Sequence, residues 1–117
     1  MPQRRSVALV SDDLMFASQL QAAIRRAGGE FALVVGEAVP LASTLFVDLN
    51  RDVEQRLELI SSLHDEQPDL EIVGFCHHAE RGIRRQALAA GARRVVNNGA
   101  LQAVALRLAG LDVGRAR

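Results

Sequence analysis

The sequence has no tryptophan, no tyrosine and no lysine, and it has only four phenylalanines among its 117 residues. So few aromatic rings argue against a platform on which the bases of single-stranded nucleic acid could stack. Fourteen arginines balance fourteen acidic residues, so the formal net charge is zero and no overall field attracts the chain to nucleic acid or anionic lipid. We therefore expect partners other than nucleic acid.

Cysteine and long apolar runs are also scarce. Cys76 is the single cysteine, so no internal disulfide can form, which is typical of a reducing compartment. The apolar run at residues 7–10 is too short for the core of a signal peptide. No run approaches the roughly 18 apolar residues that a membrane-spanning helix needs. These absences predict a cytoplasmic protein that does not enter a membrane.

The length and composition predict one globular domain over residues 1–117. Nearly half of the residues are apolar and about a quarter are charged, which is ordinary for a globular protein of this size. A chain of this length buries enough surface on folding to need no disulfide or structural metal. The sequence contains no internal repeat, low-complexity tract or interior linker.

Short apolar runs alternate with stretches of helical periodicity along the chain. The apolar runs predict five strands, at residues 6–11, 31–35, 44–47, 70–75 and 94–96. The apolar positions in the longer stretches predict four helices, which begin near residues 14, 53, 79 and 101. Gly28-Gly29 and Gly91 are suited to end helices, and Asp52 with Gln55 resembles a capping box.

Strands that are apolar on both faces and are followed by helices indicate a parallel sheet with helices on both sides. One connection does not follow this pattern, because only residues 36–43 join the second strand to the third. A parallel crossover needs roughly 10–12 residues including its helix. Pro40 also interrupts this segment, so we expect the helix there to be shortened or absent.

Polar residues follow the strands where ligands of parallel sheets bind, at the carboxyl ends. Ser11-Asp12-Asp13 follows the first strand and Asp48-Leu49-Asn50 overlaps the end of the third. Two carboxylates about 4 Å apart repel by roughly 4 kcal/mol at an effective dielectric constant near 20. Three together therefore favour a hard divalent cation such as Mg²⁺, which prefers oxygen ligands.

The segments 10–13 (VSDD), 46–50 (FVDLN) and 90–96 (AGARRVV) resemble the receiver domain of two-component response regulators. The resemblance implies a flavodoxin-like three-layer α/β sandwich with a five-stranded parallel sheet of order 2-1-3-4-5. It implies that Asp48 is the phosphoacceptor. It also implies that Asp12, Asp13 and Asp48 hold Mg²⁺, together with the backbone carbonyl of Asn50.

Three positions depart from the pattern of that family. Cys76 aligns with the family's Ser or Thr, and a thiol is a weak hydrogen-bond donor. Asn98 aligns with the family's lysine and carries no charge, and Val95 aligns with a position that is often aromatic. These differences favour a degenerate receiver, or pseudo-receiver, which would hold a phosphoryl group less firmly.

Plainer interpretations of the same residues remain open. Asp12 and Asp13 could simply cap the first helix, and Asn98 with Gly99 could cap the last one. Asp48 could belong to an ordinary turn, although Asp52 already suits the cap of the next helix. Cys76-His77-His78 lacks a second cluster to complete a zinc site, and a lone cysteine is usually a packed apolar residue.

An arginine cluster marks the region of the third predicted helix and the fifth strand. Such a cluster can be no more than a solvated helix face, but in receivers this region is the surface for dimers and partners. The cluster comprises Arg81, Arg84, Arg85, Arg93 and Arg94.

Three hypotheses about function remain. The first is a degenerate receiver that acts as a protein-interaction module, not an enzyme, and binds a histidine kinase, a regulator, an output protein or its own copy. The second is a functional receiver that is phosphorylated on Asp48 with Mg²⁺. The third is a small ligand-binding or thiol-dependent domain that uses Cys76 and His77. The missing lysine and hydroxyl group favour the first.

Overall fold

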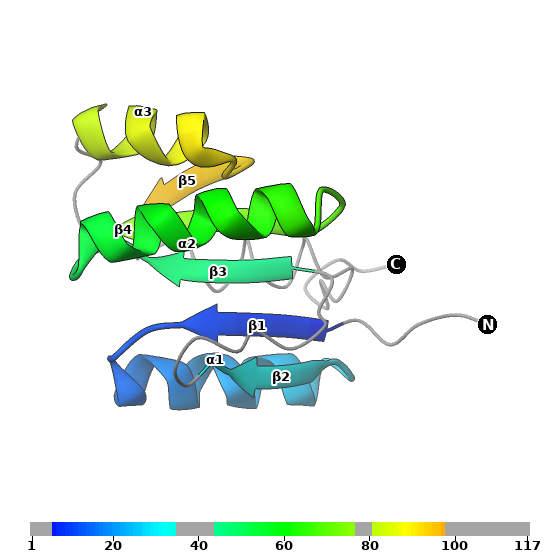
Figure 1. The fold of residues 1–117 in the computed structure, drawn as a ribbon. Coiled ribbons are helices and arrows are strands. Elements are labelled where there is room, and N and C mark those ends of the chain that lie inside the picture. The colour runs from blue at the N-terminus through cyan, green and yellow to red at the C-terminus, as the bar shows by residue number, and fades with distance from the viewer. Residues whose placement is uncertain (1–5, 35–43, 77–80, 98–117) are drawn as a thin grey trace.

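A computed structural model describes residues 6–34, 44–76 and 81–97. Five strands and three helices lie in these ranges (Figure 1). In chain order they are β1 (Ser6–Val10), α1 (Leu14–Arg26), β2 (Glu30–Leu33), β3 (Thr44–Asp48), α2 (Val53–Glu66), β4 (Glu71–Cys76), α3 (Arg81–Ala90) and β5 (Arg94–Asn97).

The five strands form one parallel sheet of order β2-β1-β3-β4-β5. The predicted strand order and fold class are therefore confirmed. The strand boundaries differ from the predicted ones by one or two residues, as is usual at strand ends. The expected helix after residue 100 and the short connection at 36–43 lie outside the described residues.

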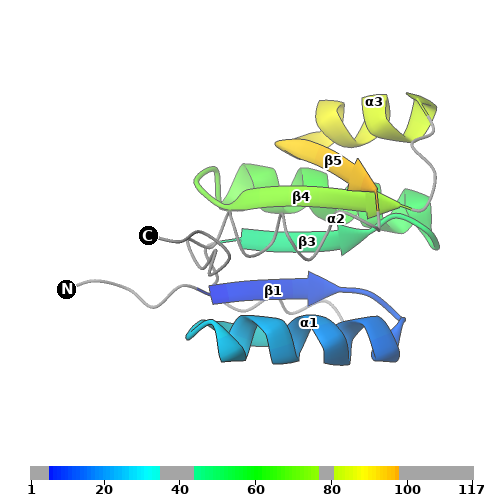
Figure 2. The ribbon, with the colours of Figure 1, turned by 180° about the vertical axis from the view of Figure 1, so that it is seen from behind.

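Helices cover both faces of the sheet. In Figure 1, α2 passes in front of β4, and in Figure 2, from the opposite side, α1 lies in front of β2. The core is divided in the same way, because α2 and α3 share one apolar cluster and α1 belongs to the other. Each strand contributes alternate side chains to the two layers, because neighbouring side chains of a strand point to opposite faces. On β1, Ala8 packs toward α2 and α3, whereas Val7 and Leu9 pack toward α1.

The start of α1 follows from its sequence. Asp13 is the N-cap, and its Oδ1 accepts a hydrogen bond of 2.9 Å from the backbone N–H of Phe16. The helix ends before Gly28, whose φ of 91° lies in the left-handed region that glycine tolerates. The expectation that this aspartate caps the helix is confirmed, whereas Asp12 does not serve as the cap.

The predicted capping box at α2 is wrong. Asp52 is the N-cap, but its side chain makes no capping hydrogen bond. Its backbone is left-handed, with φ 52° and ψ 43°, whereas a capping side chain normally sits on extended backbone. The carboxylate instead lies 3.9 Å from the guanidinium of Arg56, one turn further along the helix.

In the ranges that the structure describes, no helix combines the length and the apolar character that a membrane crossing requires.

Candidate functional site

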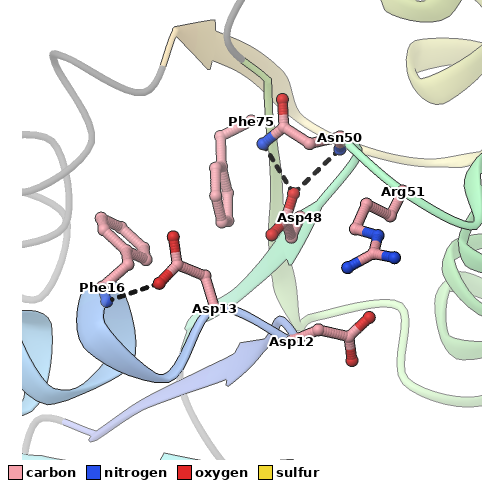
Figure 3. A pocket seen from close by; sticks show the side chains of 7 residues that line it. All are labelled: Asp12, Asp13, Phe16, Asp48, Asn50, Arg51 and Phe75. Atoms are coloured by element: carbon pink, nitrogen blue, oxygen red, sulfur yellow. Dashed lines mark hydrogen bonds between the residues drawn. The ribbon is translucent and has the colours of Figure 1, made fainter.

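A polar cavity of about 290 Å³ lies at the carboxyl ends of β1 and β3 (Figure 3). The parallel sheet brings these two strand ends side by side, because β1 and β3 are paired with Val10 opposite Val47. The predicted position of the three aspartates at one rim of the sheet agrees with this arrangement. The cavity is lined by Asp12, Asp13, Phe16, Asp48, Asn50, Arg51 and Phe75.

Asp48 is a buried carboxylate, with 6% of its surface exposed. The hydroxyl of Ser11 donates to its Oδ2 at 2.7 Å. The backbone N–H and the side-chain amide of Asn50 both donate to its Oδ1, at 2.9 Å and 2.7 Å. These hydrogen bonds offset the cost of burying a charged group. Both carboxylate oxygens of the candidate phosphoacceptor thus already have donors from within the chain.

The acidic pair after β1 is divided between two tasks. Asp13 points toward α1, where it caps the helix, and Asp12 points the other way (Figure 3). The Oδ2 of Asp12 accepts a hydrogen bond of 3.2 Å from Nη2 of Arg56. Two adjacent carboxylates that the sequence suggested as joint metal ligands therefore face different partners.

The candidate ligands fit Mg²⁺ in chemistry, because all of them offer oxygen. Among the residues that the structure describes, no three acidic, histidine or cysteine side chains are grouped so that they could hold a metal ion. Asp12, Asp13 and Asp48 each accept a hydrogen bond from the protein instead.

Sequence reasoning missed two arginines at this site. Arg56 on α2 is buried, and its Nη1 donates to the backbone carbonyl of Asp48 at 2.8 Å. Its position four residues after Asp52 was the available signal, since residues so spaced on a helix are neighbours. Arg51 is exposed and lines the cavity, and its guanidinium makes no hydrogen bond or ion pair within the described ranges.

The rings of Phe16 and Phe75 form one wall of the cavity, and they too were not predicted. Their centroids are 5.4 Å apart and their planes are inclined by 43°. Tilted aromatic pairs at such distances attract each other. This apolar wall connects the start of α1 to β4.

The positions that depart from the receiver pattern are packed into the core where they are described. Cys76 ends β4 with only 4% of its surface exposed, and Val95 on β5 is equally buried. Both belong to the apolar cluster beneath α2 and α3. Asn98, His77 and His78 lie outside the described residues.

The predicted arginine surface lies partly on α3. Arg81, Arg84 and Arg85 are exposed on that helix. Arg94 on β5 is only half-exposed, and its Nη2 lies 3.8 Å from a carboxylate oxygen of Glu71 on the neighbouring strand. Arg94 is therefore tied to the sheet, whereas the three arginines of α3 face solvent.

No protein-family model matches the chain, and no curated protein matches its sequence. Solved structures do resemble it. A CheY-like protein (tadZ) from Pseudomonas aeruginosa has a TM-score of 0.74 and 21% identity over 89% of this chain and 98% of its own. A putative pilus assembly protein (cpaE) from Burkholderia thailandensis has a TM-score of 0.70 and 20% identity over 91% and 98%.

A third similar structure is a response regulator from Burkholderia pseudomallei that contains a phosphorylated aspartic acid, a calcium ion and citrate. Its TM-score is 0.76, with 22% identity over 89% of this chain and 66% of the regulator. The chain thus has the fold of CheY-like receiver domains. At these identities the likeness concerns the fold, and the function has to be argued from the site.

Proposed function

We propose that this chain is a receiver-like signalling domain with an atypical phosphorylation pocket, which acts mainly by binding another protein. It would work in the cytoplasm and would not be an enzyme. The proposal combines the receiver fold with a pocket that differs from the phosphorylation pocket of the receiver family. The fold alone does not decide whether the domain is a phosphorylation switch or an interaction module, because one fold carries many functions.

The state of Asp48 carries the proposal. A phosphoacceptor must present a carboxylate oxygen to phosphorus, and both oxygens of Asp48 here accept hydrogen bonds from Ser11 and Asn50, which compete with that role. The neighbouring β4 end offers the buried Cys76 where a receiver would offer a hydroxyl group. A pocket organised in this way suits a domain with one stable conformation better than a domain that is switched by phosphorylation.

The exposed arginines of α3 are the proposed contact for a protein partner. Arg81, Arg84 and Arg85 place three positive charges on a helix of ten residues whose first turn carries no acidic residue. Such a surface complements an acidic protein surface. Leu88 on the same helix is 43% exposed and adds an apolar contact of the kind that protein interfaces use.

A functional receiver phosphorylated on Asp48 is the second candidate. Arg51 at the cavity rim favours it, because its guanidinium has no partner among residues 6–34, 44–76 and 81–97 and could attract a phosphoryl group. Mg²⁺ held by the aspartates would neutralise that group. By contrast, nothing favours a ligand site at Cys76, which is packed in the core.

A phosphodonor experiment separates the two candidates. The protein is incubated with Mg²⁺ and acetyl phosphate or phosphoramidate, and the mass of the intact chain is then measured. The proposal expects no gain in mass. A gain of one phosphate that disappears in Asp48→Asn would establish the second candidate instead.

The partner surface is tested with a second copy of the chain as the probe. Sedimentation velocity compares the wild type with Arg85→Glu, and Arg25→Glu at the exposed end of α1 is the matched control. If the surface mediates a homodimer, only Arg85→Glu weakens association. Equal association of both variants would show that α3 is not the contact between copies.

A further inference from the structure

Arg56 places a fixed positive charge at the acidic pocket. Its side chain is 10% exposed, and its guanidinium contacts the carboxylate of Asp12, one of the candidate metal ligands, and the backbone of Asp48. Nη1 lies 2.8 Å from the carbonyl oxygen of Asp48, and Nη2 lies 3.2 Å from Oδ2 of Asp12. The planar fork of arginine can satisfy two acceptors at once, which the point charge of a lysine does less well.

The contact with Asp12 sets up a competition. Oδ2 of Asp12 already accepts a hydrogen bond from the guanidinium, and a divalent cation needs the same carboxylate as a ligand. An ion entering the pocket must therefore share Asp12 with Arg56 or displace it. The positive charge of Arg56 also repels any second cation nearby, and solvent screens this repulsion in part because the side chain of Asp12 is 54% exposed.

We propose that Arg56 is a built-in counter-cation of the acidic pocket, which competes with divalent cations for Asp12 and keeps the affinity for Mg²⁺ low. The proposal rests on the acidic pocket assigned under the proposed function, but it requires neither phosphorylation nor a protein partner. It explains why three carboxylates can lie along one cavity without forming a metal-binding group in the described residues.

The central test is the affinity for Mg²⁺ alone, measured by calorimetric titration of the wild type and Arg56→Gln. Glutamine keeps a polar side chain but carries no charge. We expect Arg56→Gln to bind Mg²⁺ at least about tenfold more tightly than the wild type. Arg56→Lys, which keeps the charge, should remain close to the wild type. Arg84→Gln removes an exposed arginine of α3 and is the matched control.

A double variant tests whether Asp12 is the contested ligand. In Asp12→Asn/Arg56→Gln the gain in Mg²⁺ affinity should be lost, because an amide is a poorer ligand than a carboxylate. Unchanged or weaker Mg²⁺ binding by folded Arg56→Gln would overturn the proposal, and so would an equal gain in Arg84→Gln. A gain that persists in the double variant would also overturn it.

Arg56→Gln could fail to fold, because Arg56 is buried and bonded. Circular dichroism detects this, and the proposal then expects saturating Mg²⁺ to restore the folded state, since binding to the native state stabilises it. Failure of Mg²⁺ to restore the fold would contradict the proposal. A phosphate gain on Asp48 would overturn the proposed function yet leave this inference intact, so the two can fail separately.

Discussion

At the scale of single residues, Asp48 is defined by the donors around it. Its two oxygens accept hydrogen bonds from Ser11 and from two groups of Asn50, and its carbonyl accepts another from Arg56. An asparagine at this position can keep this pattern. Its oxygen can face the two donors of Asn50, and its amide can donate to the hydroxyl of Ser11.

We therefore predict that Asp48→Asn changes the free energy of unfolding by less than about 1 kcal/mol, whereas Asp48→Ala lowers it by about 2–3 kcal/mol. Alanine leaves buried donors without acceptors, and that is the costly change. Chemical denaturation followed by circular dichroism measures both variants. Asp65→Ala on the exposed face of α2 is the control and should stay within about 0.5 kcal/mol of the wild type.

Equal losses in Asp48→Asn and Asp48→Ala would show that the charge of Asp48, and not its hydrogen bonds, stabilises the pocket. The same result would make Asp48→Asn unsuitable as a control in the phosphodonor experiment.

The residue scale also shows how far sequence reasoning reaches. The positions of Asp12, Asp13 and Asp48 could be predicted, because strand ends of a parallel sheet share one edge. The partner of Asp12 could not, because Arg56 lies 44 residues away in the chain. Periodicity indicates which face of a helix is apolar, but it does not indicate which charged side chain turns inward.

At the scale of elements, the apolar runs were sufficient to predict every described strand and helix. Helix ends were predicted less well, because they depend on single backbone conformations. The pattern of Asp52 and Gln55 is typical of a capping box, yet Asp52 adopts a left-handed backbone and its side chain makes no capping hydrogen bond. Asp13, on extended backbone, does cap its helix.

Two glycines, one in α3 and one just after it, should respond to substitution by alanine in opposite ways. Gly82 lies within the exposed part of the helix, and an added Cβ would meet nothing within 4 Å. Gly91 follows the helix with φ 129°, and an added Cβ would lie 2.5 Å from Cγ of His64. Alanine is therefore favourable at the first position and both strained and crowded at the second.

We expect Gly82→Ala to raise the free energy of unfolding by about 0.5–1 kcal/mol and Gly91→Ala to lower it by about 1–3 kcal/mol. Thermal and chemical unfolding of the two variants measure this. A further variant, Gly91→Ala with His64→Gly, is compared with His64→Gly alone. The loss should then be smaller, because glycine removes both Cγ and Cβ of His64, which lie 2.5 Å and 2.6 Å from the added Cβ, but leaves the backbone strain. No recovery would assign the whole effect to the backbone.

At the scale of the whole molecule, one sheet joins two apolar layers. The layer beneath α2 and α3 contains Ile60, and the layer beneath α1 contains Leu20, both with no exposed surface. The strands β1, β3 and β4 supply side chains to both layers, so both layers depend on the same strands.

This shared sheet predicts a single cooperative unfolding transition. Leu20→Ala and Ile60→Ala should each lower the free energy of unfolding by about 2–5 kcal/mol, because each leaves a cavity in a packed layer. In both variants α1 and α2 should still lose their hydrogen-exchange protection at the same denaturant concentration, as two-state unfolding requires. If Leu20→Ala released α1 while α2 stayed protected, the layers would be independent.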